Sequence, residues 1–277
     1  MQVLRVNYTD PDAAQQFTES LKNTGFAVLY NHPIPQVLIE DIYSEWQEFF
    51  KSQAKNNYRF HRESQDGFFP QSVSETAKGY DFKDIKEYFQ YYPWGQYPDF
   101  LSDKTKLLYE QLSMMAKTLL DWVQNSLPTN IADKLSMPLP KMIENTPQTM
   151  LRILHYPPLT GAEPKGAVRA AAHGDINLLT LLVGSTASGL QVQDAKGLWH
   201  DVPCDKECIA VNIGDMLELC TQNYYHSTLH RVVNPSDENC SRLSMPLFMH
   251  PRSEVRLSPE LTAGEFLKQR LEELGVA

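Results

Sequence analysis

Three residues of the sequence could together bind a metal ion: His173, Asp175 and His230. In a β-strand, residues i and i+2 point to the same face, so His173 and Asp175 can contact one ion from one strand. His230 is the candidate for the third ligand. Two histidines and one carboxylate on one face of an octahedron leave three positions open, which suits Fe(II) in O2 chemistry. Taken alone, the His-x-Asp pattern is also typical of the polar end of a strand.

A second pair of polar residues, Arg242 and Ser244, predicts a site for an anion. On a strand these two side chains share a face, and together they can hold a carboxylate by a charge-assisted fork and a hydroxyl hydrogen bond. A co-substrate that chelates iron at one end and carries a carboxylate at the other requires such a pair. The alternative for Arg242 is a surface salt bridge.

Two further sets of residues are alternative candidates for metal ligands. His226 lies four residues before His230 and would share its strand face, so it is a rival for the third ligand. Cys204 and Cys208 lack the spacing and the second pair that a zinc knuckle needs. The four cysteines are too few for a disulfide scaffold, and we expect reduced thiols in a cytoplasmic protein.

The elements that must position these residues differ between the two halves of the chain. In the first half, we expect strands over 3–6 and 26–30 and helices over 10–23, 35–51 and 102–125. The stretch 58–100 has no clear period and is expected to be irregular structure that lies over another part of the protein.

The second half is rich in short runs of Val, Ile, Leu and Thr that are separated by turn residues. The expected strands are 150–156, 178–183, 190–193, 209–213, 227–233 and 243–250. Such spacing favours a sandwich, jelly roll or barrel. A Thr262-x-x-Glu265 capping box predicts a C-terminal helix over 262–274. The expected fold class is therefore mainly β with flanking helices.

Composition excludes several classes of protein. The 277 residues are 42% hydrophobic, which is enough for a core, and the formal net charge of -9 argues against a nucleic-acid binder. No apolar run is long enough to span a membrane, and because the N-terminus has no apolar h-region we expect no signal peptide. We expect one large domain without nucleic-acid or membrane partners.

The segment 151–251 resembles the isopenicillin N synthase-like family of 2-oxoglutarate/Fe(II)-dependent oxygenases, also called the iron/ascorbate oxidoreductase family. Residues 24–32 and 84–89 resemble that family's N-terminal strand and its Asp-x-Lys-Glu segment. The ordered motifs that carry the resemblance are Leu151–Pro158, His173-Gly174-Asp175 with Leu179–Leu182, Gly189–Val192, Trp199-x-x-Val202, Asn212–Asp215, Tyr225–Val232 and Arg242-x-Ser244.

The resemblance implies a double-stranded β-helix (jelly-roll) core and a dioxygenase, an oxidoreductase that hydroxylates, desaturates or cyclises a small molecule with O2. It implies His173, Asp175 and His230 as the iron ligands, because the family ligand is the histidine before Arg-Val. Arg242 and Ser244 would bind the far carboxylate of 2-oxoglutarate, and Tyr156 would contact co-substrate or substrate. Many 2-oxoglutarate users have Asn where this chain has Leu154. The implied division is 1–146 (a region wrapping the core), 147–256 (the core) and 257–277 (a C-terminal helix).

Other residues are candidates for the substrate side. Counting back by two from His173 places Arg169 on the metal-facing side if the strand extends that far, where it could bind an anionic substrate. Aromatic residues of the irregular stretch could line the same side: Phe68, Phe69, Tyr80 and Phe82. Two alternative functions are an Fe(II) oxidase that takes electrons from substrate or ascorbate instead of 2-oxoglutarate, and a non-catalytic jelly-roll protein that holds a metal for structure.

Overall fold

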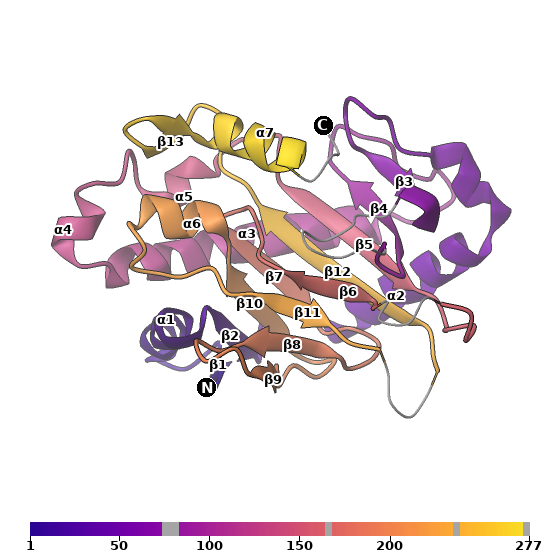
Figure 1. The fold of residues 1–277 in the computed structure, drawn as a ribbon, viewed down its shortest axis with the longest axis horizontal. Helices are drawn as coiled ribbons and strands as arrows, with labels where there is room; N and C mark the ends of the chain where they lie inside the picture. The colour runs from indigo at the N-terminus through magenta and orange to yellow at the C-terminus, as the bar shows by residue number, and fades with distance from the viewer. Residues whose placement is uncertain (74–82, 164–167, 235–238, 274–277) are drawn as a thin grey trace.

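The structure is a computed structural model that describes residues 1–73, 83–163, 168–234 and 239–273 (Figure 1). The described elements of the first half are β1 (Arg5–Asn7), α1 (Ala13–Thr24), β2 (Phe26–Tyr30), α2 (Gln36–Lys51), η1 (Gln53–Tyr58), β3 (Gly67–Phe69), η2 (Gln71–Val73), β4 (Glu87–Tyr91), α3 (Lys104–Ser126), α4 (Thr129–Ala132) and α5 (Leu139–Met142). Those of the second half are β5 (Met150–Tyr156), β6 (Ala170–His173), β7 (Leu179–Val183), β8 (Leu190–Gln193), β9 (Trp199–Asp201), β10 (Ile209–Ile213), α6 (Asp215–Cys220), β11 (His230–Val232), β12 (Arg242–Met249), β13 (Arg256–Ser258), β14 (Leu261–Thr262) and α7 (Ala263–Glu273).

Two sheets form the core of the molecule (Figure 1). The larger has eight strands in the order β1-β2-β10-β7-β12-β5-β4-β3, and the smaller has four in the order β6-β11-β8-β9. The inner strands of the larger sheet and the four strands of the smaller one are antiparallel and mostly not consecutive in the chain. This is the expected double-stranded β-helix core, and the prediction of a mainly β protein with flanking helices is confirmed.

Strand alternation divides the larger sheet into two faces with different partners. One face carries Leu181, Val211 and Leu247 into a continuous apolar cluster with residues of α1, α2 and α3. The other face carries Arg242 and Ser244 of β12, opposite Tyr156 and Leu154 of β5 in register. Because directly opposed residues share a face, the polar residues of β12 are turned away from the helices.

The predicted helices form for the reasons that the sequence indicates. α2 begins after Pro35 and buries Ile39, Ile42 and Trp46, while α1 ends at Gly25, whose left-handed φ of 73° closes the helix. The Thr262–Glu265 capping box is formed: the Glu265 carboxylate accepts hydrogen bonds from the Thr262 amide (2.9 Å) and hydroxyl (2.7 Å).

Three expectations about elements were wrong. The stretch 58–100 contains β3 and β4, and β4 pairs with β5 along its full length, so part of it is sheet. The strand expected over 227–233 covers only β11. The first strand is displaced to residues 5–7, where it pairs in parallel with β2. Strands of three residues, such as β1, β3 and β11, show too little periodicity to be recognised from sequence.

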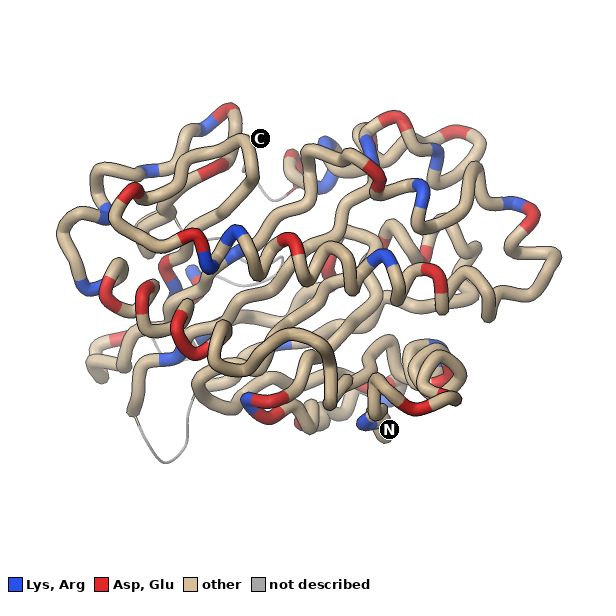
Figure 2. The backbone as a smooth tube through the Cα atoms, turned by 180° about the vertical axis from the view of Figure 1, so that it is seen from behind, with Lys and Arg blue, Asp and Glu red and all other residues tan. Residues whose placement is uncertain are grey.

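Seen from behind, Lys and Arg are interspersed with Asp and Glu along the backbone (Figure 2). Among the described residues, we find no helix with both the length and the apolar character needed to cross a membrane.

Candidate metal centre

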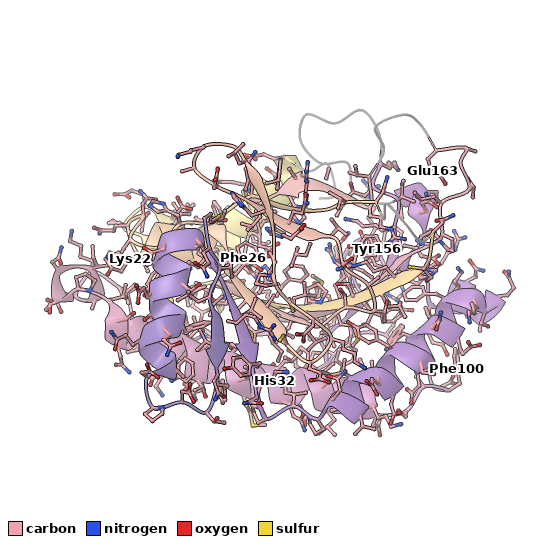
Figure 3. The ribbon with its side chains drawn as sticks, turned by 90° about the horizontal axis from the view of Figure 1, so that it is seen from below. Lys22, Phe26, His32, Phe100, Tyr156 and Glu163 are labelled. Carbon is pink, nitrogen blue, oxygen red and sulfur yellow. The ribbon has the colours of Figure 1, made fainter. Side chains whose placement is uncertain are left out.

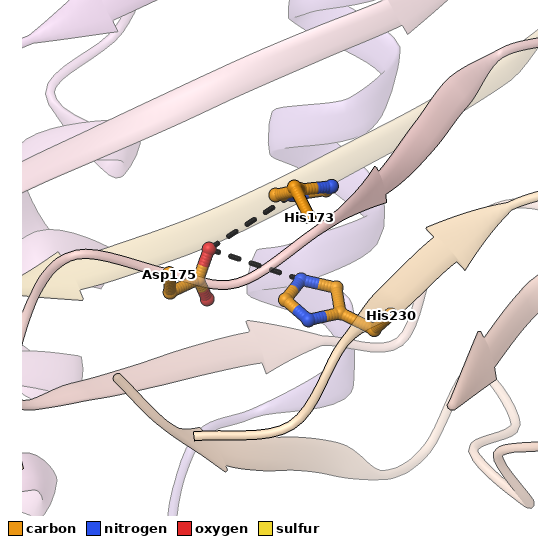
Figure 4. Close-up of side chains that lie close together, drawn as sticks. All are labelled: His173, Asp175 and His230. Atoms are coloured by element: carbon orange, nitrogen blue, oxygen red, sulfur yellow. Dashed lines mark ion pairs between the residues drawn. The ribbon is translucent and has the colours of Figure 1, made fainter. Parts of the chain in front are cut away.

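The three predicted ligands converge between the two sheets (Figure 4). His173 is the last residue of β6 and His230 is the first of β11, and the two are paired in register. Asp175 lies in the loop after β6. The expectation that one strand carries both His173 and Asp175 is therefore wrong: the strand ends at His173, and the following turn brings the carboxylate back toward the imidazoles.

The ligand atoms of this trio lie within 4.8 Å of one another, and it is the one such group of His, Cys, Asp or Glu among the described residues. Oδ1 of Asp175 lies 4.0 Å from Nε2 of His173 and 3.8 Å from Nε2 of His230. Two imidazole nitrogens and one carboxylate oxygen are the donor set that suits Fe(II) with open coordination positions.

Backbone carbonyls fix both imidazole rings. Nδ1 of His173 lies 2.8 Å from the carbonyl of Ala171, and Nδ1 of His230 lies 3.2 Å from the carbonyl of Thr228. A carbonyl can only accept, so each Nδ1 carries the proton and each Nε2 presents a lone pair toward Asp175. Phe26 packs edge-on against the His230 ring, with centroids 5.5 Å apart.

The Asp175 carboxylate is oriented by two side chains of the larger sheet. Its Oδ2 accepts hydrogen bonds from Oγ1 of Thr180 (2.5 Å) and Nδ2 of Asn212 (2.8 Å), which leaves Oδ1 for the imidazoles. Thr180 and Asn212 are opposite one another in register on β7 and β10. Their roles were not predicted, although a polar residue inside each of two apolar strands was the available signal.

The protonation states favour metal binding. Burial by itself would raise the pKa of Asp175, but the two imidazoles and the two hydrogen bonds together lower it, so the carboxylate is ionised. Although the His173 side chain is 42% exposed, its ring lies deep between the sheets. Burial, and then the positive charge of His230, lower the pKa of His173 to about 4. Its imidazole is therefore neutral near pH 7, as a metal ligand must be.

Arg242 and Ser244 lie at one end of the same inner face, and both are buried, with exposed fractions of 1% and 2%. Nε of Arg242 donates to the carbonyl of Ala187 (3.0 Å) and Nη2 to Oγ of Ser185 (2.9 Å), while Nη1 has no hydrogen-bond partner among the described residues. The surface salt bridge considered for Arg242 is thereby excluded.

Tyr156 lies inside the molecule, between the sheets, whereas Glu163 lies at its periphery (Figure 3). The guanidinium of Arg242 lies 5.1 Å from the centre of the Tyr156 ring. Leu154 belongs to the same small apolar cluster as Tyr156. This cluster places an apolar wall beside the buried arginine.

Arg169 lies outside β6, so it does not belong to the strand face that the sequence predicts for it. β6 has a register shift relative to β11, because His173 is opposite His230 but Ala170 is opposite Val232. Between these two pairs β6 contains one residue more than β11. After this bulge Ala170, and not Ala171, shares the face of His173. Arg169 precedes the strand and is nevertheless buried, with an exposed fraction of 1%, because its side chain turns toward the segment that leads into β12.

The aromatic candidates separate by strand alternation. Phe69 faces the site side, where it stacks on Tyr88 with centroids 4.7 Å apart in the cluster that contains Tyr156. Phe68, its neighbour on β3, points the other way and packs against Phe49 and Phe50 in the main core, so it is corrected to a core residue. Tyr80 and Phe82 lie outside the described residues.

His226 is not part of the trio. It lies in the loop before β11, its side chain is 62% exposed, and its Nδ1 lies 3.5 Å from a Glu218 carboxylate oxygen. The premise that His226 shares a strand face with His230 was wrong, because the strand begins only at His230.

Comparison with protein families gives two matches. Residues 147–251 match the 2OG-Fe(II) oxygenase superfamily, and residues 3–112 match the family described as the N-terminal region of non-haem dioxygenase in morphine synthesis.

Solved structures and curated proteins agree with these matches. A structure from Shewanella oneidensis whose name gives only the class oxygenase is 50% identical, with all of both chains covered and a TM-score of 0.91. A structure from Caulobacter crescentus assigned to the 2OG-Fe(II) oxygenase family is 30% identical, with 98% of each chain covered and a TM-score of 0.78. The 2-oxoglutarate-dependent dioxygenase citB of Monascus ruber is 28% identical over 90% of this chain and 82% of its own length.

Proposed function

The chain belongs to the 2OG-Fe(II) oxygenase superfamily, and we propose from this premise that it uses Fe(II) and 2-oxoglutarate to oxidise a small molecule with O2. When bound, Fe(II) and 2-oxoglutarate supply the O2 chemistry, and the protein supplies geometry, charge and exclusion of water. We infer the role of each residue from its position.

We propose that His173, Asp175 and His230 hold the iron. Each imidazole presents Nε2 because its Nδ1–H is held by a backbone carbonyl. Asp175 offers Oδ1 alone, since its Oδ2 is engaged by Thr180 and Asn212. A monodentate carboxylate and two imidazole nitrogens leave three coordination positions of the iron for co-substrate and O2.

We propose that Arg242 and Ser244 bind the distal carboxylate of 2-oxoglutarate and that Tyr156 packs against it. The observation that carries this proposal is the unpartnered Nη1 of a fully buried Arg242, on the same face of the sheets as the trio. A buried cation with a free N–H is costly unless an anion binds there. The apolar wall of Leu154 and Tyr156 excludes water and strengthens that interaction.

Succinate release tests the proposed function. Purified protein with Fe(II), 2-oxoglutarate and a pooled metabolite library should release succinate above the level without library, and His173→Ala should abolish it. Arg242→Met should raise the KM for 2-oxoglutarate more than it changes kcat. Oxygen uptake without succinate would overturn the 2-oxoglutarate requirement in favour of an ascorbate- or substrate-driven oxidase. No oxygen uptake with any pool would favour a structural metal site.

Several finer statements are also proposals. We propose that no nucleic acid is bound and that the protein is cytoplasmic, the last because the four cysteines are free thiols. We propose the boundaries 1–146, 147–256 and 257–277, with the first region wrapping the core. The support is that β1, β2, β3 and β4 extend the larger sheet and do not form one of their own.

A further inference from the structure

A second arginine lies buried beside Arg242. Arg169 directly precedes β6, and its Nη2 donates to the backbone carbonyl of Cys240, two residues before Arg242 opens β12. Its backbone amide is held by Oδ1 of Asn234 at 3.1 Å. The two arginines and Tyr156, which ends β5 opposite Arg242, therefore meet at one end of the two sheets.

Neither guanidinium has an acidic partner among the described residues. Each arginine is 1% exposed, and the side-chain contacts of both are to backbone carbonyls, to a serine hydroxyl and to the Tyr156 ring. Burial first, and then the positive charge of Arg242, lowers the pKa of Arg169. Two like charges that are buried together without a carboxylate are unfavourable unless an anion joins them.

Both guanidiniums keep an unused N–H. Nε of Arg169 and Nη1 of Arg242 are buried and lack any hydrogen-bond partner in the part of the chain that is described. A carboxylate accepts about four hydrogen bonds through its two oxygens, so one carboxylate can serve both arginines. One carboxylate would give each of the two open N–H groups an oxygen to bond and would offset part of the positive charge of the pair.

We infer that Arg169 is a second arginine of the distal carboxylate site and a specificity-determining residue for a dicarboxylic keto acid. This inference rests on the proposed function. His173 lies four residues after Arg169, and four residues of extended chain span at most about 13 Å, so Arg169 is within reach of a short keto acid whose other end lies at the trio. Arg169 is thereby assigned to the co-substrate in place of the substrate anion suggested by strand counting.

The inference predicts which co-substrates are rejected. A site that pairs two buried cations with one carboxylate discriminates strongly against a ligand that lacks it, because both cations are then left unpaired. 2-Oxopentanoate has the same five-carbon chain and keto acid as 2-oxoglutarate but no distal carboxylate, so it is the matched probe.

The experiment measures binding of both keto acids to Mn(II)-loaded full-length protein by calorimetry. Arg169→Met should weaken binding of 2-oxoglutarate by roughly 10- to 100-fold, the range for loss of a hydrogen bond to a charged group. It should leave the weak binding of 2-oxopentanoate unchanged, and Arg169→Lys should recover part of the loss. In turnover, the KM for 2-oxoglutarate should rise more than kcat falls.

Arg252→Met is the matched control, because Arg252 also donates to backbone carbonyls, those of Lys141 and Glu144, away from the trio. It should bind 2-oxoglutarate as the unaltered protein does. Failure of the unaltered protein to bind 2-oxoglutarate would sink the proposed function itself. Two outcomes would overturn only the inference if the unaltered protein binds 2-oxoglutarate. In one, Arg169→Met binds 2-oxoglutarate as tightly as the unaltered protein; in the other, it loses affinity for both keto acids equally. An effect confined to the KM of the oxidised substrate would also overturn it. If Arg169→Met does not fold, Arg169→Lys with both keto acids decides the question.

Discussion

Removing the hydrogen bonds that orient Asp175 should weaken metal binding without removing a ligand. Thr180→Val keeps the volume of the side chain and deletes the hydroxyl that donates to Oδ2 of Asp175 at 2.5 Å. Asn212→Leu deletes the amide that donates to the same oxygen at 2.8 Å. With one bond left, the carboxylate can rotate, and Oδ1 is no longer held facing the two Nε2 atoms.

The size of the effect follows from the kind of bond lost. A hydrogen bond to a charged group contributes about 1.5–3 kcal/mol, and loss of a residue that orients a metal ligand typically costs about 10- to 100-fold in metal affinity. Each single change should therefore weaken Mn(II) binding by roughly 10- to 100-fold, or about 1.4–2.8 kcal/mol. The lost bond also raises the pKa of Asp175, so the deficit should grow as the pH falls toward that pKa.

Calorimetric titration of the apoprotein with Mn(II) measures this, with thermal unfolding as the test that each variant is folded. Thr221→Val is the matched control, because Thr221 is equally buried and donates to the carbonyl of Leu217 away from the trio. Asp175→Ala gives the limit of no site. The reasoning is refuted if folded Thr180→Val and Asn212→Leu bind Mn(II) with the affinity of Thr221→Val.

Two further perturbations test the surroundings of the site. Gly25→Ala should destabilise the protein by roughly 1–3 kcal/mol and weaken Mn(II) binding, because the new Cβ would collide with Oγ1 of Thr228, whose carbonyl holds His230. Gly161→Ala, also at positive φ but with open space around it, measures the backbone cost alone, and equal losses in the two variants would contradict the collision. Burial would raise the pKa of Glu87, but hydrogen bonds from His155 and Lys55 lower it in the folded protein. The ionised Glu87 therefore stabilises the fold fully above the ordinary pKa of 4.5, and this contribution to the free energy of unfolding is lost as the pH falls through the lowered pKa of the folded state. Glu87→Gln should lower the Tm at pH 7 and flatten the fall in Tm between pH 5 and 3; an unchanged acid slope would argue against this account.

The donor set of His173, Asp175 and His230 suits an open iron site, but the His-x-Asp pattern alone does not single these residues out. The ordered motifs of the family resemblance are what indicate this trio, and Arg242 with Ser244, from the sequence. The β-strand runs of the second half were predicted because they are apolar and bounded by turn residues.

The parts that were missed depend on register between strands that are distant in the chain. Thr180 and Asn212 contact Asp175 because β7 and β10 are neighbours in the sheet, and no local pattern in either strand indicates the other. Phe68 and Phe69 are adjacent residues of the same type, so the sequence does not distinguish them. The pairing of β3 with β4 decides which of the two faces the site.

The bulge in β6 explains how one short segment can carry His173 and Arg169 to the two ends of the proposed site. Regular alternation would put Arg169, Ala171 and His173 on one face and would send Ala170 outward. The extra residue returns Ala170 to the inner face, where its small side chain lies beside Tyr156 in the apolar cluster. Arg169 is then outside the strand and free of its alternation, so its side chain can reach the carbonyl of Cys240 next to Arg242. The run of three alanines carries no sequence signal of this irregularity, which is why counting residues predicted the wrong face for Arg169.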